Sequence, residues 1–119
     1  MFFNPKERLL IENGFKPARF HGGEQVIYYT CSKMPGGNFE DYVGKSEGNF
    51  RRRIASHMKK PWGPYIKEIW VKELENDAIN IFWEEQKYIK ILNPSINCKP
   101  GETRKEVEYR IIYGNKNAA

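Results

Sequence analysis

The chain has 119 residues, of which 39% are hydrophobic and 14% aromatic, so it suits one folded domain and is too aromatic for a disordered chain. Its net charge of +5 favours polyanionic partners, since Lys and Arg release counterions from a phosphate backbone, although many basic proteins bind no nucleic acid. The sequence shows neither a bilayer-spanning apolar run nor the basic-then-apolar start of a signal peptide, so we expect a cytoplasmic protein without a membrane partner.

The N-terminal half predicts a short helix, a loop and a β-hairpin, at residues 6–13, 15–24 and 25–44. Asn4 can cap the helix and Gly14 can end it. Residues 25–32 are rich in β-branched and aromatic side chains, which is typical of a strand. A Pro-Gly-Gly turn separates this strand from a second, short strand at 39–44, and the two strands are expected to pair in antiparallel fashion.

The C-terminal half predicts two helices that alternate with two strands. These elements are a helix at 48–60, a strand within 65–73, a helix that ends near residue 92 and a strand at 107–113. In the first helix Phe50, Ile54 and Met58 recur every four residues and make a narrow apolar stripe. Asn76 or Asp77 can cap the second helix.

These elements predict an α+β domain. A small antiparallel sheet, made of the β-hairpin and a third strand, is flanked by helices, with an extra N-terminal helix and a C-terminal strand. We expect one compact domain in three parts, which are an N-terminal extension at 1–24, a core at 25–98 and a C-terminal extension at 99–119.

One carboxylate of the second helix falls on its apolar side. At about 100° per residue, the apolar stripe of this helix contains Ala78, Ile79, Phe82, Ile89 and Leu92. Glu85 lies within this stripe, whereas Glu84 lies on the opposite, solvated side. A carboxylate that faces a core is unfavourable unless a partner compensates its charge. A divalent cation and a structural salt bridge to an Arg both fit Glu85 on this observation alone.

A basic pair marks the first of these two helices. Arg53 and His57 are four residues apart, so they share one flank beside the apolar stripe, while Arg51 and Arg52 point elsewhere. Arg can donate two parallel hydrogen bonds to a phosphate, and His can relay a proton near neutral pH. A solvated basic face would show the same pattern.

Two tyrosines, Tyr28 and Tyr42, fall in the adjacent strands of the expected hairpin. A Tyr hydroxyl can hold a water molecule, although strand aromatics are most often packing residues. The order and spacing of these tyrosines and of the helix residues named above resemble the motifs of the GIY-YIG nuclease superfamily. The matching segments, in chain order, are Val26-Ile27-Tyr28, Tyr42-Val43-Gly44, Arg53 with His57, and Glu85 followed by Pro94 and Asn97. The departures are Val26 for Gly, Val43 for Ile, and one extra residue, Gly48, before the helix.

The resemblance implies a hydrolase that cuts DNA phosphodiester bonds with one divalent metal, Mg²⁺ or in its place Mn²⁺, held by Glu85. It implies that Tyr28 is the general base or positions the attacking water, with its pKa lowered by neighbouring cations. It implies that Tyr42 and His57 position groups or relay protons, and that Arg53 holds the scissile phosphate. Asn97 would support the site by hydrogen bonds. Gly44 would allow the phosphate or Lys45 to approach the backbone closely.

Five basic residues are candidates for nucleic-acid contacts: Lys45, Arg51, Arg52, Lys59 and Lys60. For Lys45 a solvated side chain is equally open. Cutting both strands of a duplex with one site would require a homodimer or two encounters. The alternatives are a nucleic-acid-binding module that does not cleave, a nuclease directed at RNA, and a non-enzymatic α+β protein in which Glu85 pairs with an Arg.

Overall fold

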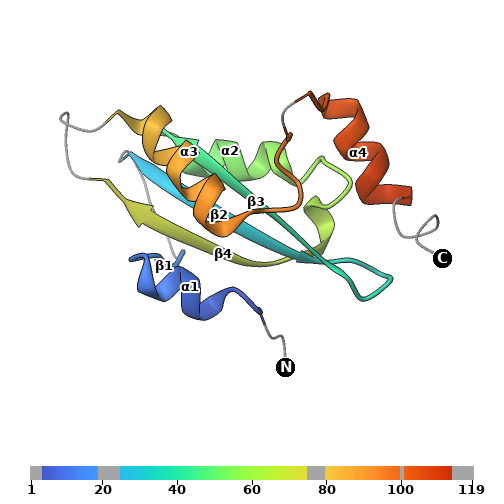
Figure 1. The fold of residues 1–119 in the computed structure, drawn as a ribbon, viewed down its shortest axis with the longest axis horizontal. Helices are drawn as coiled ribbons and strands as arrows, with labels where there is room; N and C mark the ends of the chain where they lie inside the picture. The colour runs from blue at the N-terminus through green and yellow to red at the C-terminus, as the bar shows by residue number, and fades with distance from the viewer. Residues whose placement is uncertain (1–3, 19–24, 75–79, 100, 114–119) are drawn as a thin grey trace.

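The computed structural model describes residues 4–18, 25–74, 80–99 and 101–113, and within them the chain is an α+β domain (Figure 1). Its four strands form one antiparallel sheet in the order β1-β4-β2-β3. The strands are β1 (Lys16–Pro17), β2 (Val26–Lys33), β3 (Phe39–Ser46) and β4 (Ile66–Glu73). The helices are α1 (Glu7–Glu12), α2 (Phe50–His57), the 3-10 turn η1 (Gly63–Tyr65), α3 (Ile81–Leu92) and α4 (Arg104–Tyr113).

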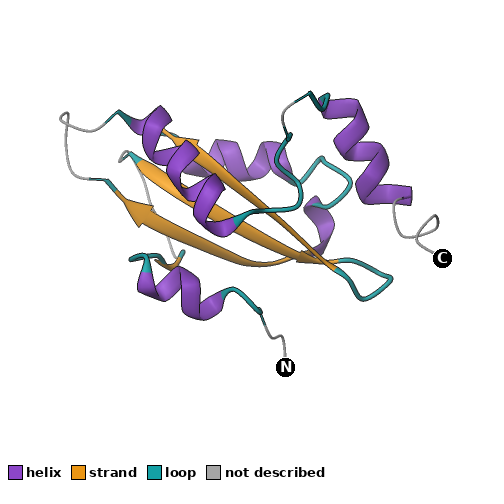
Figure 2. Cartoon of the chain, viewed as in Figure 1, coloured by secondary structure: helices purple, strands orange, loops and turns teal. Residues whose placement is uncertain are grey.

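Strand β2 is the centre of the molecule and is buried on both faces. It pairs with β3 and with β4, so the expected hairpin and third strand are confirmed. Its side chains alternate between two clusters, because successive strand residues point to opposite faces of a sheet. Ile27 and Tyr29 pack with Tyr88 of α3 on one face, whereas Val26 and Tyr28 pack with Phe50 of α2 on the other. Helices therefore cover both faces of the sheet (Figure 2).

The expected strand at 107–113 is wrong, because this segment belongs to helix α4. The Thr103 hydroxyl accepts a hydrogen bond from the Glu106 N–H, and the Glu106 carboxylate accepts one from the Thr103 N–H. This reciprocal pair is a capping box that starts the helix. Val107 and Ile111, four residues apart, then face Trp62 in a third apolar cluster.

The expected loop at 15–24 is wrong in its first residues, because Lys16 and Pro17 form strand β1 on the free edge of β4. The helix before it has Lys6 as its N-terminal cap residue, and Asn4 accepts the Lys6 N–H at 2.8 Å. Gly14 ends this helix as predicted, with a φ of +83° that favours glycine.

The other two helices begin later than the sequence pattern predicts. Helix α2 starts at Phe50 behind an Asn49 cap, and α3 starts at Ile81 behind an Asn80 cap. The expected cap and stripe residues of α3 at 76–79 lie outside the described residues. Phe82 is 47% exposed and does not belong to the buried stripe, which Ile81, Tyr88 and Leu92 form instead. None of the helices in the described part of the chain has the length and hydropathy needed to cross a membrane.

Candidate active site

The two hairpin motifs meet where the ring of Tyr28 lies over Gly44. These residues are partners in the β2–β3 register. A Cβ on Gly44 would lie 2.4 Å from the Tyr28 hydroxyl oxygen, so any side chain there would collide with the ring. The missing side chain of Gly44 thus makes room for Tyr28, which corrects the expectation that it admits a phosphate or Lys45.

Four of the predicted site residues lie together on this side of the sheet. The Tyr28 hydroxyl and His57 Nε2 are 2.6 Å apart, and this hydrogen bond is buried. The Tyr42 and His57 rings lie 4.8 Å apart between centroids. Arg53, one helical turn before His57, lies close enough to the Tyr28 hydroxyl for its positive charge to act on the pKa of that phenol. The four-residue spacing in α2 therefore brings the guanidinium and the imidazole to the same tyrosine.

Burial sets the protonation states of this cluster. It raises the pKa of Tyr28 far above its ordinary value, and the opposing effect of Arg53 is smaller. The expected lowering of the Tyr28 pKa is therefore wrong. Burial also raises the pKa of Tyr42. Burial first, and then the positive charge of Arg53, lowers the pKa of His57 to about 4. Near neutral pH both phenols are thus protonated and His57 is neutral.

These residues face a cleft of about 330 Å³, which we call the central cleft. Tyr42, Arg53 and His57 line it, and so does Glu85 on α3. Tyr28 has no exposed surface and lies behind His57. The cleft thus combines a guanidinium, a neutral imidazole, a phenol and a carboxylate, with Tyr28 as a buried support.

Glu85 is only partly buried, as is Glu84, so the expected contrast between a core-facing and a fully solvated carboxylate is weaker than the helical pattern suggests. Burial raises the pKa of Glu85, and the charges of Lys45 and Arg53 oppose this effect. Glu85 differs from Glu84 mainly in lining the central cleft. Among the described residues, no three His, Cys, Asp or Glu side chains form a metal-binding cluster, so Glu85 stands as a single carboxylate.

Asn97 fastens the segment after α3 to the sheet next to Tyr42. Its side-chain oxygen accepts the Val43 N–H at 2.9 Å, and its side-chain nitrogen donates to the Val43 carbonyl at 2.9 Å. The paired hydrogen bonds hold one wall of the central cleft against β3, in agreement with the support expected of Asn97.

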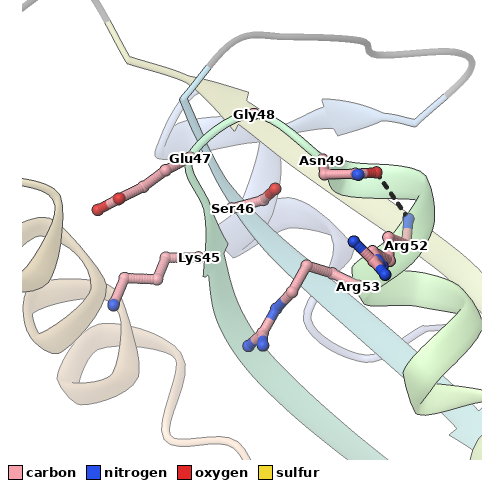
Figure 3. Close-up of a pocket in the computed structure, with 7 residues that line it drawn as sticks. All are labelled: Lys45, Ser46, Glu47, Gly48, Asn49, Arg52 and Arg53. Atoms are coloured by element: carbon pink, nitrogen blue, oxygen red, sulfur yellow. Dashed lines mark hydrogen bonds between the residues drawn. The ribbon is translucent and has the colours of Figure 1, made fainter.

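The five candidate basic residues do not all line one cavity. Lys45 and Arg52 line a second pocket beside the cleft, together with Arg53 (Figure 3). Lys60 lines the central cleft and forms an ion pair with Glu108 of α4 at 3.4 Å. Arg51 and Lys59 are exposed and line neither cavity.

Helix α4 adds a site residue that the sequence pattern did not indicate. Arg104, in its first turn, lines the central cleft, and its charge contributes to the lowered pKa of His57. Trp62 lines the cleft as well, and its indole nitrogen is buried without a hydrogen-bond partner. The Thr-x-x-Glu sequence at 103–106 was the signal that places Arg104 at a helix start.

Comparison of the chain with protein-family models, with curated proteins and with solved structures finds no match. The chemistry of the site must therefore be judged from its own residues.

Proposed function

We propose that the chain is a divalent-metal-dependent nuclease that hydrolyses DNA phosphodiester bonds in the central cleft. One observation carries this proposal. Arg53 and His57, brought together beside the Tyr28 ring over Gly44, line the same cleft as Glu85. Groups that can grip a phosphate, position a water molecule and hold a cation thus line one cavity. The order and spacing of these residues also resemble the GIY-YIG nuclease superfamily.

A magnesium ion fits the donor groups of this cleft. Mg²⁺ is commonly bound by one or two carboxylates and completes its shell with waters and substrate phosphate oxygens. Glu85 offers one half-buried carboxylate, beside the guanidinium that would hold the phosphate. Glu85 would hold the ion, and Mn²⁺ can take its place. When bound, the ion supplies positive charge that stabilises the phosphate and the leaving 3′ oxygen.

The protein groups divide the remaining work. His57 is neutral near pH 7, but its Nε2 is hydrogen-bonded to the Tyr28 hydroxyl and its Nδ1 is buried. It therefore positions the tyrosine cluster, and the proton that the attacking water loses as its oxygen bonds to phosphorus passes to solvent. Tyr28 is a positioning residue, because it is buried and holds His57 through the 2.6 Å hydrogen bond. Arg53 donates to the phosphate oxygens, where negative charge increases in the transition state. Tyr42 orients the water from beside the imidazole ring.

The decisive test removes the charge of Glu85 while keeping its size. We expect Glu85→Gln to abolish Mg²⁺-dependent cleavage without unfolding the domain, whereas Glu84→Gln, one residue away on the same helix, retains activity. Cleavage is measured on single-stranded, duplex and branched DNA and on RNA, with Mg²⁺, Mn²⁺ or EDTA. Equal cleavage by Glu85→Gln, or cleavage in EDTA, would contradict the metal role of Glu85.

A nucleic-acid-binding module that does not cleave is the second candidate function. The raised pKa and complete burial of Tyr28 favour it, because this phenol cannot itself serve as a ready base. Such a module would bind DNA equally with Mg²⁺ or EDTA and would leave every substrate intact. The RNA arm of the same panel separates a DNA-directed from an RNA-directed enzyme. If both strands of a duplex are cut, one central cleft per chain requires a homodimer or two encounters.

A further inference from the structure

A second cavity of about 460 Å³ lies where β3 leads into α2, and we call it the loop pocket (Figure 3). Apart from Arg53, the residues of this pocket have no part in the roles proposed above. The residues that line it are Lys45, Ser46, Glu47, Gly48, Asn49, Arg52 and Arg53. Gly48 has a φ of 151°, a conformation that favours glycine, so the residue inserted before α2 shapes the loop that walls this pocket.

The side chains of the loop pocket make it positive. Lys45, Arg52 and Arg53 contribute three cations, against one carboxylate from Glu47. In Figure 3 the Glu47 carboxylate points away from Arg52 and Arg53. Asn49 caps α2 by accepting the Arg52 N–H at 3.2 Å, which fixes the start of the helix at the pocket. The cavity therefore suits an anion.

A buried hydroxyl without a partner points to a ligand at this place. Ser46 is only 2% exposed, and its Oγ has no hydrogen-bond partner. Its side chain points toward the Asn49 side of the pocket (Figure 3). A buried polar group left unsatisfied destabilises a fold, so such groups are uncommon in native proteins. An oxygen of a bound anion would accept a hydrogen bond from the Ser46 hydroxyl and so satisfy this buried polar group.

We propose that the loop pocket binds the phosphate next to the scissile phosphate on the same nucleic-acid strand. Arg53 lines both the loop pocket and the central cleft, so the two cavities adjoin at one guanidinium. A strand whose scissile phosphate lies in the central cleft must place a neighbouring phosphate nearby, because its charges repeat along the backbone. This inference rests on the proposed function, since it assigns the neighbour of the phosphate that the central cleft would hold.

The pocket positions the strand and is sequence-independent, because a phosphate carries no base information. Ser46 and Arg52 contact the neighbouring phosphate, and Arg53 bridges it to the scissile one. The enzyme therefore needs a charged phosphate on one side of the cut. A strand that ends at the scissile bond on that side is a poor substrate.

The test measures binding separately from cleavage. The full chain carrying Glu85→Gln is titrated, by fluorescence anisotropy in EDTA, with a single-stranded DNA oligonucleotide. Adding Arg52→Ala is expected to weaken binding about tenfold, because a hydrogen bond to a charged group is lost. It should also lower the slope of log K against log salt by about 0.7. Arg8→Ala, which removes the same charge from exposed α1, is the matched control and should change neither value.

Ser46→Ala separates a ligand contact from a structural role. Removing a buried, unpartnered hydroxyl should leave the thermal midpoint unchanged or raise it, yet binding should weaken. Neutral methylphosphonates are then placed one at a time along the oligonucleotide. In the Glu85→Gln protein that keeps Ser46 and Arg52, the replacement should weaken binding when it stands at the position next to the cut. The same replacement should have a much smaller effect on the Ser46→Ala, Arg52→Ala double variant, in which only Arg53 still contacts this phosphate.

The possible negative results distinguish the loop-pocket proposal from the proposed nuclease function. Unchanged binding in Arg52→Ala and Ser46→Ala overturns the loop pocket, even if the unmodified chain cleaves DNA as proposed. Pocket-dependent binding without cleavage by the unmodified chain overturns the nuclease and leaves the loop pocket standing. Absence of any DNA binding overturns both.

Discussion

At the scale of single residues, the Tyr28 ring packs directly against the Gly44 backbone. We predict that Gly44→Ala destabilises the protein by about 3 kcal/mol, because its Cβ would overlap a buried ring that has no room to move. The free energy of unfolding is measured in urea. Gly36→Ala is the control: its Cβ would lie 3.4 Å from the Asn38 side chain, and a change of about 0.5 kcal/mol or less is expected. Equal effects of the two substitutions would contradict the packing of Tyr28 on Gly44.

His57 makes stability depend on pH. Its pKa is about 4 in the folded protein, below the ordinary value of about 6.5 in the unfolded chain. As the pH falls from about 6.5 to about 4, the unfolded chain takes up a proton on His57 and the folded protein does not. The free energy of unfolding therefore decreases over this pH range. The loss from this residue is about 2 kcal/mol between about pH 7 and about pH 5.

His57→Gln should show a smaller difference in unfolding free energy between these two pH values than the unmodified chain. The two proteins share every other titratable group, so the difference between them isolates the contribution of the imidazole. An identical pH dependence would show that His57 is not held neutral by the fold.

The identities of the clustered residues could be predicted from the sequence, but their environments could not. Arg53 and His57 share a flank of α2 because helical spacing fixes their relation. The burial of Tyr28 behind His57 depends instead on how α2 crosses the sheet. Its raised pKa follows from that tertiary packing, so an ordinary strand tyrosine with a lowered pKa was the wrong expectation.

At the scale of elements, α4 contributes Arg104 and Val107 to the lining of the central cleft. We predict that Arg104→Ala lowers kcat/KM for DNA about tenfold, mainly through KM, because one charged contact to the substrate is lost while Glu85, Arg53 and His57 remain. Steady-state kinetics measure the effect. Lys105→Ala removes an equal charge from the next, exposed position and should leave kcat/KM within about twofold. If Lys105→Ala matched Arg104→Ala, the effect would come from overall charge.

The sequence pattern identified the element type where one rule dominated and failed where two competed. Strands β2 and β3 follow from dense β-branched and aromatic residues around a Pro-Gly-Gly turn. In α4 the apolar residues at 107–113 suited either a strand or a helix, and the capping box of Thr103 and Glu106 decided for the helix. In α3 the buried face contains Ile81, Tyr88 and Leu92 and leaves Phe82 exposed, because packing against the sheet, and not the hydrophobic pattern of the helix alone, decides which face is buried.

At the scale of the whole molecule, the N-terminal segment is built into the sheet domain. Strand β1 extends the sheet on β4, and Leu10 and Phe15 enter the core cluster that contains Tyr88. Lys6 Nζ lies 2.6 Å from the Asp41 carboxylate of β3, which also accepts the Tyr29 hydroxyl at 2.9 Å. These contacts join residues far apart in the chain, so no local pattern in residues 1–24 could show that they complete the core.

Leu10 provides a test of this integration. It is fully buried, and we predict that Leu10→Ala costs about 3 kcal/mol of unfolding free energy, because it leaves a cavity between α1 and the sheet. The neighbouring Ile11→Ala also shortens an aliphatic side chain of α1, but Ile11 is 59% exposed, so a change of about 0.5 kcal/mol or less is expected. Unfolding is followed both by far-ultraviolet circular dichroism and by tryptophan fluorescence, since Trp70 lies in the same cluster. One coincident transition with a lower midpoint for Leu10→Ala is the expected result, because the segment and the sheet share one core. Two separate transitions, or an unchanged midpoint in Leu10→Ala, would mean that α1 and β1 are only appended to a domain that is stable without them.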